Sequence, residues 1–138
     1  MAEFQLFGAL VMGLIVSLIE IFFVHEDEAG LGWMKHAAHA VPVCFILTFI
    51  AMNVPYAMNL AQTQLGWAWL TGPLATFGIP VLMGIIATVK VKAAAAITTG
   101  RSAIGEKFVH ALIVGVIIAA SPFIWPLVQP MVPAFLNF

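Results

Sequence analysis

Charged residues are scarce in this sequence. Five of its 138 residues are lysine or arginine and six are aspartate or glutamate, together 8% of the chain. Soluble domains carry roughly 25% charged residues, and a water-soluble protein of this size could not cover its surface with so few. The chain also lacks a basic patch that could contact phosphates, which argues against nucleic-acid binding.

Cysteine occurs once, as Cys44 within an apolar run. A lone cysteine excludes an internal disulfide and a metal site built from several thiolates. We interpret it as a small packing residue rather than a reactive thiol. The N-terminus lacks the Lys/Arg-rich start of a secretory signal, so we expect the first apolar run to be retained as a membrane span.

Long apolar runs make up most of the chain. Hydrophobic residues account for 63% of it, and the mean hydropathy is +1.10. Four runs, at about 4–24, 37–60, 74–95 and 108–128, are close to the roughly 20 residues that a helix needs to cross a bilayer. The sequence therefore predicts an all-α integral membrane protein, a single transmembrane domain built as a four-helix bundle. Residues 129–138 are expected to form an apolar tail at the outer membrane surface.

The basic residues predict the orientation of this multi-pass protein. All of them lie in or beside the first and third connections, at Lys35, Lys90, Lys92, Arg101 and Lys107. Cytoplasmic loops carry an excess of Lys and Arg. We therefore expect both charged connections on the cytoplasmic side and both termini on the outer side. Four aromatic residues fall at the predicted outer boundary and one at the inner, and we interpret them as interfacial anchors: Tyr56, Trp67, Trp69, Trp125 and Trp33.

A shift of the chain against itself by 71 residues aligns its two halves. Met12-Gly13 then falls on Met83-Gly84, and His39-Ala40 on His110-Ala111. The identities alone are too few to establish a repeat, but the matched residues share a predicted depth. Small residues recur every four positions in each span, a pattern that lets membrane helices approach closely. We therefore carry two alternatives, a tandem duplication of a two-helix hairpin and an ordinary alanine-rich bundle.

Prolines are frequent in the apolar runs. Six of them are expected to interrupt the second, third and fourth spans: Pro42, Pro55, Pro73, Pro80, Pro122 and Pro126. Each frees a backbone carbonyl four residues earlier, which needs another hydrogen-bond donor or an ion. Packing explains such kinks more simply than transport does.

Polar side chains gather near the predicted cytoplasmic face. Imidazole and carboxylate groups together suit Zn, Mn, Fe or Ni, so a divalent metal is the cofactor that these residues could hold. The candidate ligands are His36, His39, His110, Glu20 and Glu26. The spacing is weakly specific, and interfacial or hydrogen-bonding histidines are the simpler interpretation.

Glu20 lies inside the predicted end of the first span. An ionised group there costs on the order of 3 kcal/mol, so it needs a partner, a proton or water. The simplest interpretation is an internal ion pair with Lys90, which the 71-residue shift places at nearly the same depth. The alternatives are a cation pathway, with Glu20, Lys90, Asp27 and Glu28 as its residues, and snorkelling of the side chain to the interface.

Three functions remain compatible with the sequence. We place first a small transporter or channel for a cation, a proton or a divalent metal, that acts as a homo-oligomer in the lipid bilayer. The second is a non-catalytic subunit that binds other membrane subunits. The third is a membrane metalloenzyme built on the histidine and carboxylate cluster, which lacks a clear general base. An enzymatic role is therefore the least favoured of the three.

Overall fold

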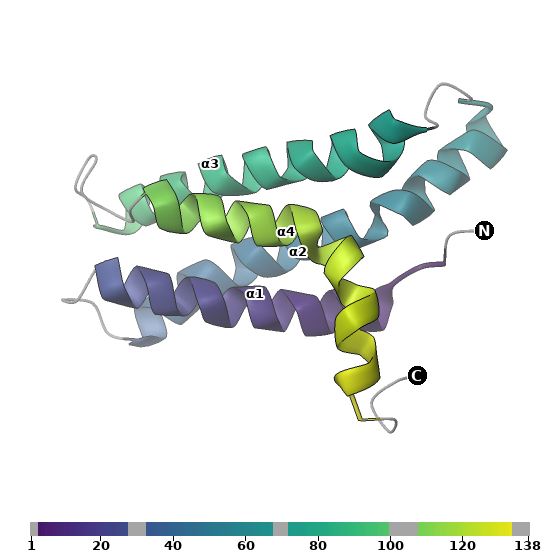
Figure 1. Ribbon diagram of the computed structural model, residues 1–138. Coiled ribbons are helices and arrows are strands. Elements are labelled where there is room, and N and C mark those ends of the chain that lie inside the picture. Colours follow the sequence, from purple (N-terminus) through teal and green to yellow (C-terminus); the bar gives the residue numbers. More distant parts are fainter. Residues whose placement is uncertain (1–2, 28–32, 68–71, 100–107, 134–138) are drawn as a thin grey trace.

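A computed structural model of the chain describes residues 3–27, 33–67, 72–99 and 108–133 (Figure 1). The elements are helix α1 (Leu6–Asp27), helix α2 (Trp33–Leu65), a π-helical turn η1 (Leu74–Gly78), helix α3 (Ile79–Thr99), helix α4 (Phe108–Val128) and a 3₁₀ turn η2 (Gln129–Met131). All secondary-structure elements of the described residues are helical and none is a strand, as predicted.

The four helices form two antiparallel hairpins, α1 with α2 and α3 with α4, packed side by side (Figure 1). We call the end where α1 begins and α4 finishes the terminal end, and the end where α1 finishes and α2 begins the loop end. Gly66 and Gly72 have φ angles of 67° and 71° and flank the link between the hairpins. Glycine adopts this left-handed conformation without the steric cost of a Cβ atom.

All four main helices are long and apolar enough to cross a membrane. The qualifying segments are Leu6–Glu26, Val41–Leu65, Thr76–Ala93 and Phe108–Met131, which overlap the four predicted runs. Large apolar side chains such as Leu18, Phe22, Val89 and Val116 are more than half exposed on the outside of the bundle. Exposed apolar surface of this extent marks contact with lipid or with other proteins.

Helices α2 and α4 continue through the prolines that were expected to interrupt these spans. Pro42 and Pro55 lie inside the 33 residues of α2, and Pro122 and Pro126 lie inside α4. A membrane-length helix can continue through proline when neighbouring groups satisfy the freed carbonyls. The last part of α4 turns away from the bundle axis and crosses the beginning of α1 (Figure 1).

The first connection is shorter than predicted. Residues His25, Glu26 and Asp27 complete the last turns of α1, so the acidic stretch is largely helical. Glu28 lies outside the described residues. So do Trp69, the Arg101–Lys107 link and the end of the tail, residues 134–138, whose predicted roles remain predictions.

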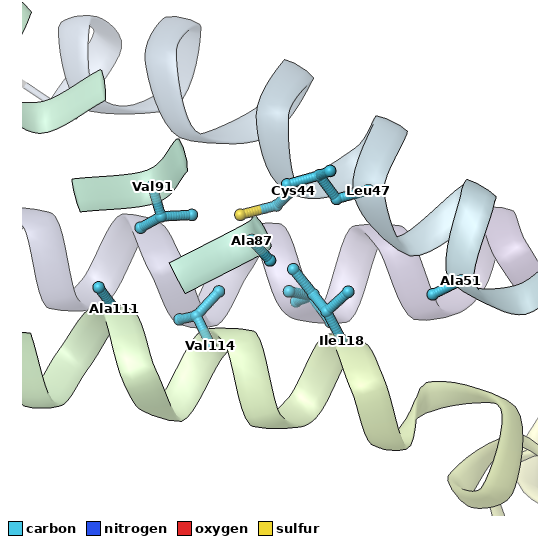
Figure 2. Close-up of a cluster of buried hydrophobic side chains, with 9 residues drawn as sticks. Cys44, Leu47, Ala51, Ala87, Val91, Ala111, Val114 and Ile118 are labelled. Carbon is cyan, nitrogen blue, oxygen red and sulfur yellow. The ribbon is translucent and has the colours of Figure 1, made fainter. Parts of the chain in front are cut away.

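Small and branched side chains from all four helices fill the bundle (Figure 2). The main buried cluster consists of Val16, Cys44, Leu47, Ala51, Ala87, Val91, Ala111, Val114 and Ile118. A second cluster lies at the terminal end and comprises Ala9, Met12, Met52 and Trp125. Cys44 is fully buried, which suits the packing role expected of it.

Helices α1 and α3 bury matching positions. Ala9, Gly13, Val16, Ser17 and Glu20 of α1 are buried, and so are the residues 71 positions later: Pro80, Gly84, Ala87, Thr88 and Val91. Each of the two helices also contains an equivalent hydrogen bond from a side chain to its own backbone. Ser17 Oγ donates to the Gly13 carbonyl (2.7 Å), and Thr88 Oγ1 donates to the Gly84 carbonyl (2.9 Å).

Candidate functional site

Glu20 is a carboxylate inside the bundle. It lies six residues before the end of the membrane-length segment of α1, on the same helix face as Val16 and Val24, and only 3% of its surface is exposed. The helix buries this position because residues four apart share one face. Val16 belongs to the main buried cluster and Val24 is 4% exposed, so Glu20 has buried apolar neighbours on its own helix in both directions.

The pairing of α1 with α2 places a histidine position level with Glu20. A Cβ atom added to Gly13 would lie 3.0 Å from the Phe45 ring, so these residues face one another. Seven residues further along α1 is Glu20, and seven residues back along the antiparallel α2 is position 38. The His39 backbone is therefore level with Glu20 to within about one residue, or about 1.5 Å of helix rise.

His36 and His39 both lie in α2, three residues apart, so they share one face of a helix as expected. Their side chains are not among those described. The prediction that they bind a metal therefore stays a prediction.

His110, by contrast, has a defined environment. This half-buried residue opens α4, and its ring stacks on Phe23 of α1 with centroids 4.3 Å apart and planes 12° from parallel. Phe23 lies three residues beyond Glu20, or about 4.5 Å along the axis. The fold thus brings Glu20, the His39 position and His110 to one level of the bundle, within about one helical turn.

The other predicted pathway residues lie at the surface or cannot be placed. Lys90 and Glu26 are exposed, whereas Glu20 is buried. Asp27 ends α1, but its side chain is not described, and Glu28 lies outside the described residues. Among the described side chains, no three histidine, cysteine, aspartate or glutamate residues form a group that could hold a metal ion.

Besides Glu20, the inside of the bundle contains buried hydroxyl groups. Ser17 and Thr48 are 1% and 0% exposed, and Ser121, which the sequence analysis did not single out, is also fully buried. Ser17 and Ser121 donate to the carbonyls of Gly13 and Ile117 on their own helices. Thr48 Oγ1 is buried and has no hydrogen-bond partner within the described part of the chain.

Asn53 continues this polar series toward the terminal end. Its amide donates to the Phe49 carbonyl (3.0 Å), and its Oδ1 accepts the Gln5 N–H (2.8 Å). The side chain therefore joins the beginning of α1 to α2. It does not bond the carbonyl that Pro55 frees, which belongs to Ala51.

Comparison of the chain with protein-family models, with curated proteins and with solved structures found no match.

A lateral groove of about 340 Å³ runs between α3 and α4 on the outside of the bundle. Gly84 and Gly115 form its floor, where the two helix backbones touch: a Cβ atom added to Gly84 would lie 2.7 Å from the Gly115 carbonyl oxygen. Phe77 and Phe123 stack across it with ring centroids 5.7 Å apart. This groove presents small and apolar side chains to the surroundings.

Proposed function

We propose that this chain is an integral membrane protein that transports a cation, with the Glu20 carboxylate as the group that binds it. The observation that carries the proposal is the burial of Glu20, 3% exposed within a helix long enough to cross a bilayer. An ionisable residue at such a position is costly and marks a functional site by default. We further propose the predicted sidedness, with both termini outside and the loop end in the cytoplasm.

The packing around Glu20 favours a proton over a hydrated metal ion as the cargo. The main buried cluster, which includes Val16 one turn from Glu20, consists of apolar side chains, whereas a hydrated metal ion needs oxygen ligands around it. A proton needs only a chain of hydroxyl groups and water molecules. A divalent metal stays an alternative cargo, because the His36 and His39 side chains could add ligands.

Polar groups of α1 and α2 lie between Glu20 and the terminal end of the bundle. Ser17 lies one turn along α1, Thr48 of α2 is level with residues 10–12 of α1, and Asn53 bonds Gln5 at the terminal end. Along the axis, the step from Ser17 to Thr48 covers about 9 Å and the step from Thr48 to Asn53 about 7.5 Å. Bridging water molecules would have to complete such a route, and the Thr48 hydroxyl has hydrogen-bonding capacity left for one.

The matched burial of α1 and α3 supports the proposal that the two hairpins arose by duplication. The equivalent of Glu20 in α3 is Val91, so the second hairpin lacks the carboxylate. We propose that the second hairpin serves as a packing platform and that the cation site belongs to the first. We also propose a homo-oligomer, whose subunits would meet through the exposed apolar faces.

Proton flux into proteoliposomes tests this function. We expect a membrane potential to drive protons through the wild-type protein, so that an imposed pH gradient collapses. We expect Glu20→Gln to reduce the rate of this proton flux to that of protein-free vesicles. Glu26→Gln is the matched control, since Glu26 is an exposed glutamate on the same helix. Flux that survives Glu20→Gln would overturn the proposal, whereas flux of Zn²⁺ or Mn²⁺ without proton flux would change the cargo.

The lateral groove favours a second candidate, a non-catalytic subunit of a larger membrane complex. Small residues along a groove let another helix approach its floor closely. Native mass spectrometry of the protein extracted in nanodiscs separates the two functions. Detection of a homo-oligomer supports the transporter. Detection of a different chain in a fixed ratio supports the subunit role, provided that this chain is lost when Ala119→Phe fills the groove.

A further inference from the structure

A second polar site lies at the terminal end, far from Glu20. It is a pocket of about 400 Å³ between the first turn of α1 and the distal part of α4, and we call it the terminal pocket. Its polar lining comes from Glu3, Gln5, Trp125 and Gln129. The last part of α4 lies across the beginning of α1 (Figure 1), and residues of both helices line this pocket.

The first turn of α1 supplies hydrogen-bond donors to the pocket. The first hydrogen bond of this helix runs from the Ala9 N–H to the Gln5 carbonyl (3.1 Å). The N–H groups of Leu6 and Gly8 precede it and have no acceptor within the helix. The N-terminus of a helix also carries a partial positive charge, which favours an anion such as a phosphate group.

Trp125 provides a second and independent donor. Its side chain is 5% exposed and stacks edge-on against Phe7 at 5.9 Å. A Cβ atom added to Gly8 would lie 2.9 Å from the indole Nε1, so this edge of the ring faces the first turn of α1 at the pocket. No hydrogen bond within the described part of the chain uses the indole N–H. The sequence alone predicts only an interfacial anchor at Trp125.

Glu3 restricts the charge of the ligand. Its carboxylate lines the same pocket and is exposed. A purely anionic group would meet the helix N-terminus favourably but Glu3 unfavourably. A zwitterion that carries a phosphate and a primary ammonium satisfies both, because the ammonium can donate hydrogen bonds to the carboxylate. A choline group has no N–H to donate.

We propose that the terminal pocket binds the head group of a phosphoethanolamine lipid. The phosphate would accept hydrogen bonds from the Trp125 indole and the first turn of α1, and the ammonium would pair with Glu3. The flanking helix surfaces are apolar and would receive the acyl chains. This inference depends on the membrane placement but not on transport by Glu20, so either can fail while the other stands.

Native mass spectrometry with matched lipids tests the site. Phosphatidylethanolamine, phosphatidylcholine and phosphatidylglycerol of identical chain length are titrated against the detergent-solubilised full chain. We expect phosphatidylethanolamine to bind at least about threefold more tightly than the others, the effect of one hydrogen bond or more. Equal binding of the three lipids would overturn the proposal.

Two variants locate the binding. Trp125→Phe keeps an aromatic ring and removes the indole N–H, and we expect it to weaken phosphatidylethanolamine binding about three- to tenfold. Glu3→Gln, at an exposed position that cannot disrupt the core, should abolish the preference over phosphatidylcholine. Trp67→Phe, an exposed tryptophan outside the pocket, is the control and should change nothing. Unchanged binding in both pocket variants would contradict the assignment.

Soluble competitors separate a lipid from a free metabolite as the ligand. Glycerophosphoethanolamine carries the same head group without acyl chains, and inorganic phosphate carries the anion alone. Retention of the lipid against millimolar amounts of both supports the lipid. Displacement by either compound would assign the pocket to a soluble ligand and overturn the lipid assignment.

Discussion

At the scale of single residues, Glu20 and Lys90 show how one position along a helix decides a role. Glu20 occupies the buried face of α1, and its 71-residue equivalent on α3 is the buried Val91. Lys90 is one residue earlier, a rotation of about 100° around the helix, and is exposed. The depth of the two charges could be inferred from the sequence, but the face that each occupies depends on how the hairpins pack.

A buried carboxylate also makes a prediction about stability. Glu20→Met keeps a side chain of similar size and removes the polar group, and should raise the free energy of unfolding by about 1–3 kcal/mol. The measurement is denaturant-induced unfolding in mixed micelles, followed by circular dichroism. The variant should be more stable yet inactive in flux, the trade-off expected of a functional polar group. A less stable Glu20→Met protein would assign Glu20 a structural role.

At the scale of the helices, close backbone contact joins α3 to α4. A Cβ atom added to Gly115 would lie 2.5 Å from the Gly84 carbonyl oxygen and would collide with Thr88 Oγ1. The neighbour is largely backbone, which cannot move aside. In the first hairpin, Gly13 faces the flexible ring of Phe45 at 3.0 Å instead.

This difference predicts unequal effects of the same substitution. Gly115→Ala should destabilise the protein by about 1–3 kcal/mol, because overpacking displaces a helix. Gly13→Ala should cost less, since the Phe45 ring can shift. Both variants are compared with wild-type protein by unfolding in mixed micelles, and equal effects at the two positions would contradict the packing described for α3 and α4.

Predictability from sequence differs between the elements. The four membrane-length helices follow from the apolar runs, because in lipid a single apolar segment can satisfy its backbone hydrogen bonds internally only as a helix. The helical continuation of α1 through His25, Glu26 and Asp27 did not follow, because the apolar run that predicts this helix ends at Val24. The sequence predicts an interruption of the fourth span at Pro122 and Pro126 but not the direction in which the end of α4 turns (Figure 1), so the burial of Trp125 and the terminal pocket could not be anticipated.

At the scale of the whole molecule, the two ends of the bundle differ in their polar residues. The charged residues described at the loop end and the polar terminal pocket lie at opposite ends of a bundle whose first helix spans 22 residues, about 33 Å. That length matches the hydrocarbon core of a bilayer.

Single-cysteine labelling tests this placement. In a Cys44→Ala background, Glu3→Cys and Glu26→Cys place thiols at exposed positions near the two ends of α1. A membrane-impermeant maleimide applied to right-side-out vesicles should label the first and should reach the second only after permeabilisation. Labelling of both from one side would show that α1 does not cross the membrane, and labelling in the reverse order would invert the proposed orientation.

The most direct test of the account compares Glu20→Asp with Glu20→Gln in vesicles under the same driving force. If a titratable carboxyl group at this position carries the proton, Glu20→Asp should retain measurable proton flux while Glu20→Gln, closer to glutamate in shape, should have none. Equal flux in the two variants, whether both active or both inactive, would contradict the central role of the Glu20 carboxylate.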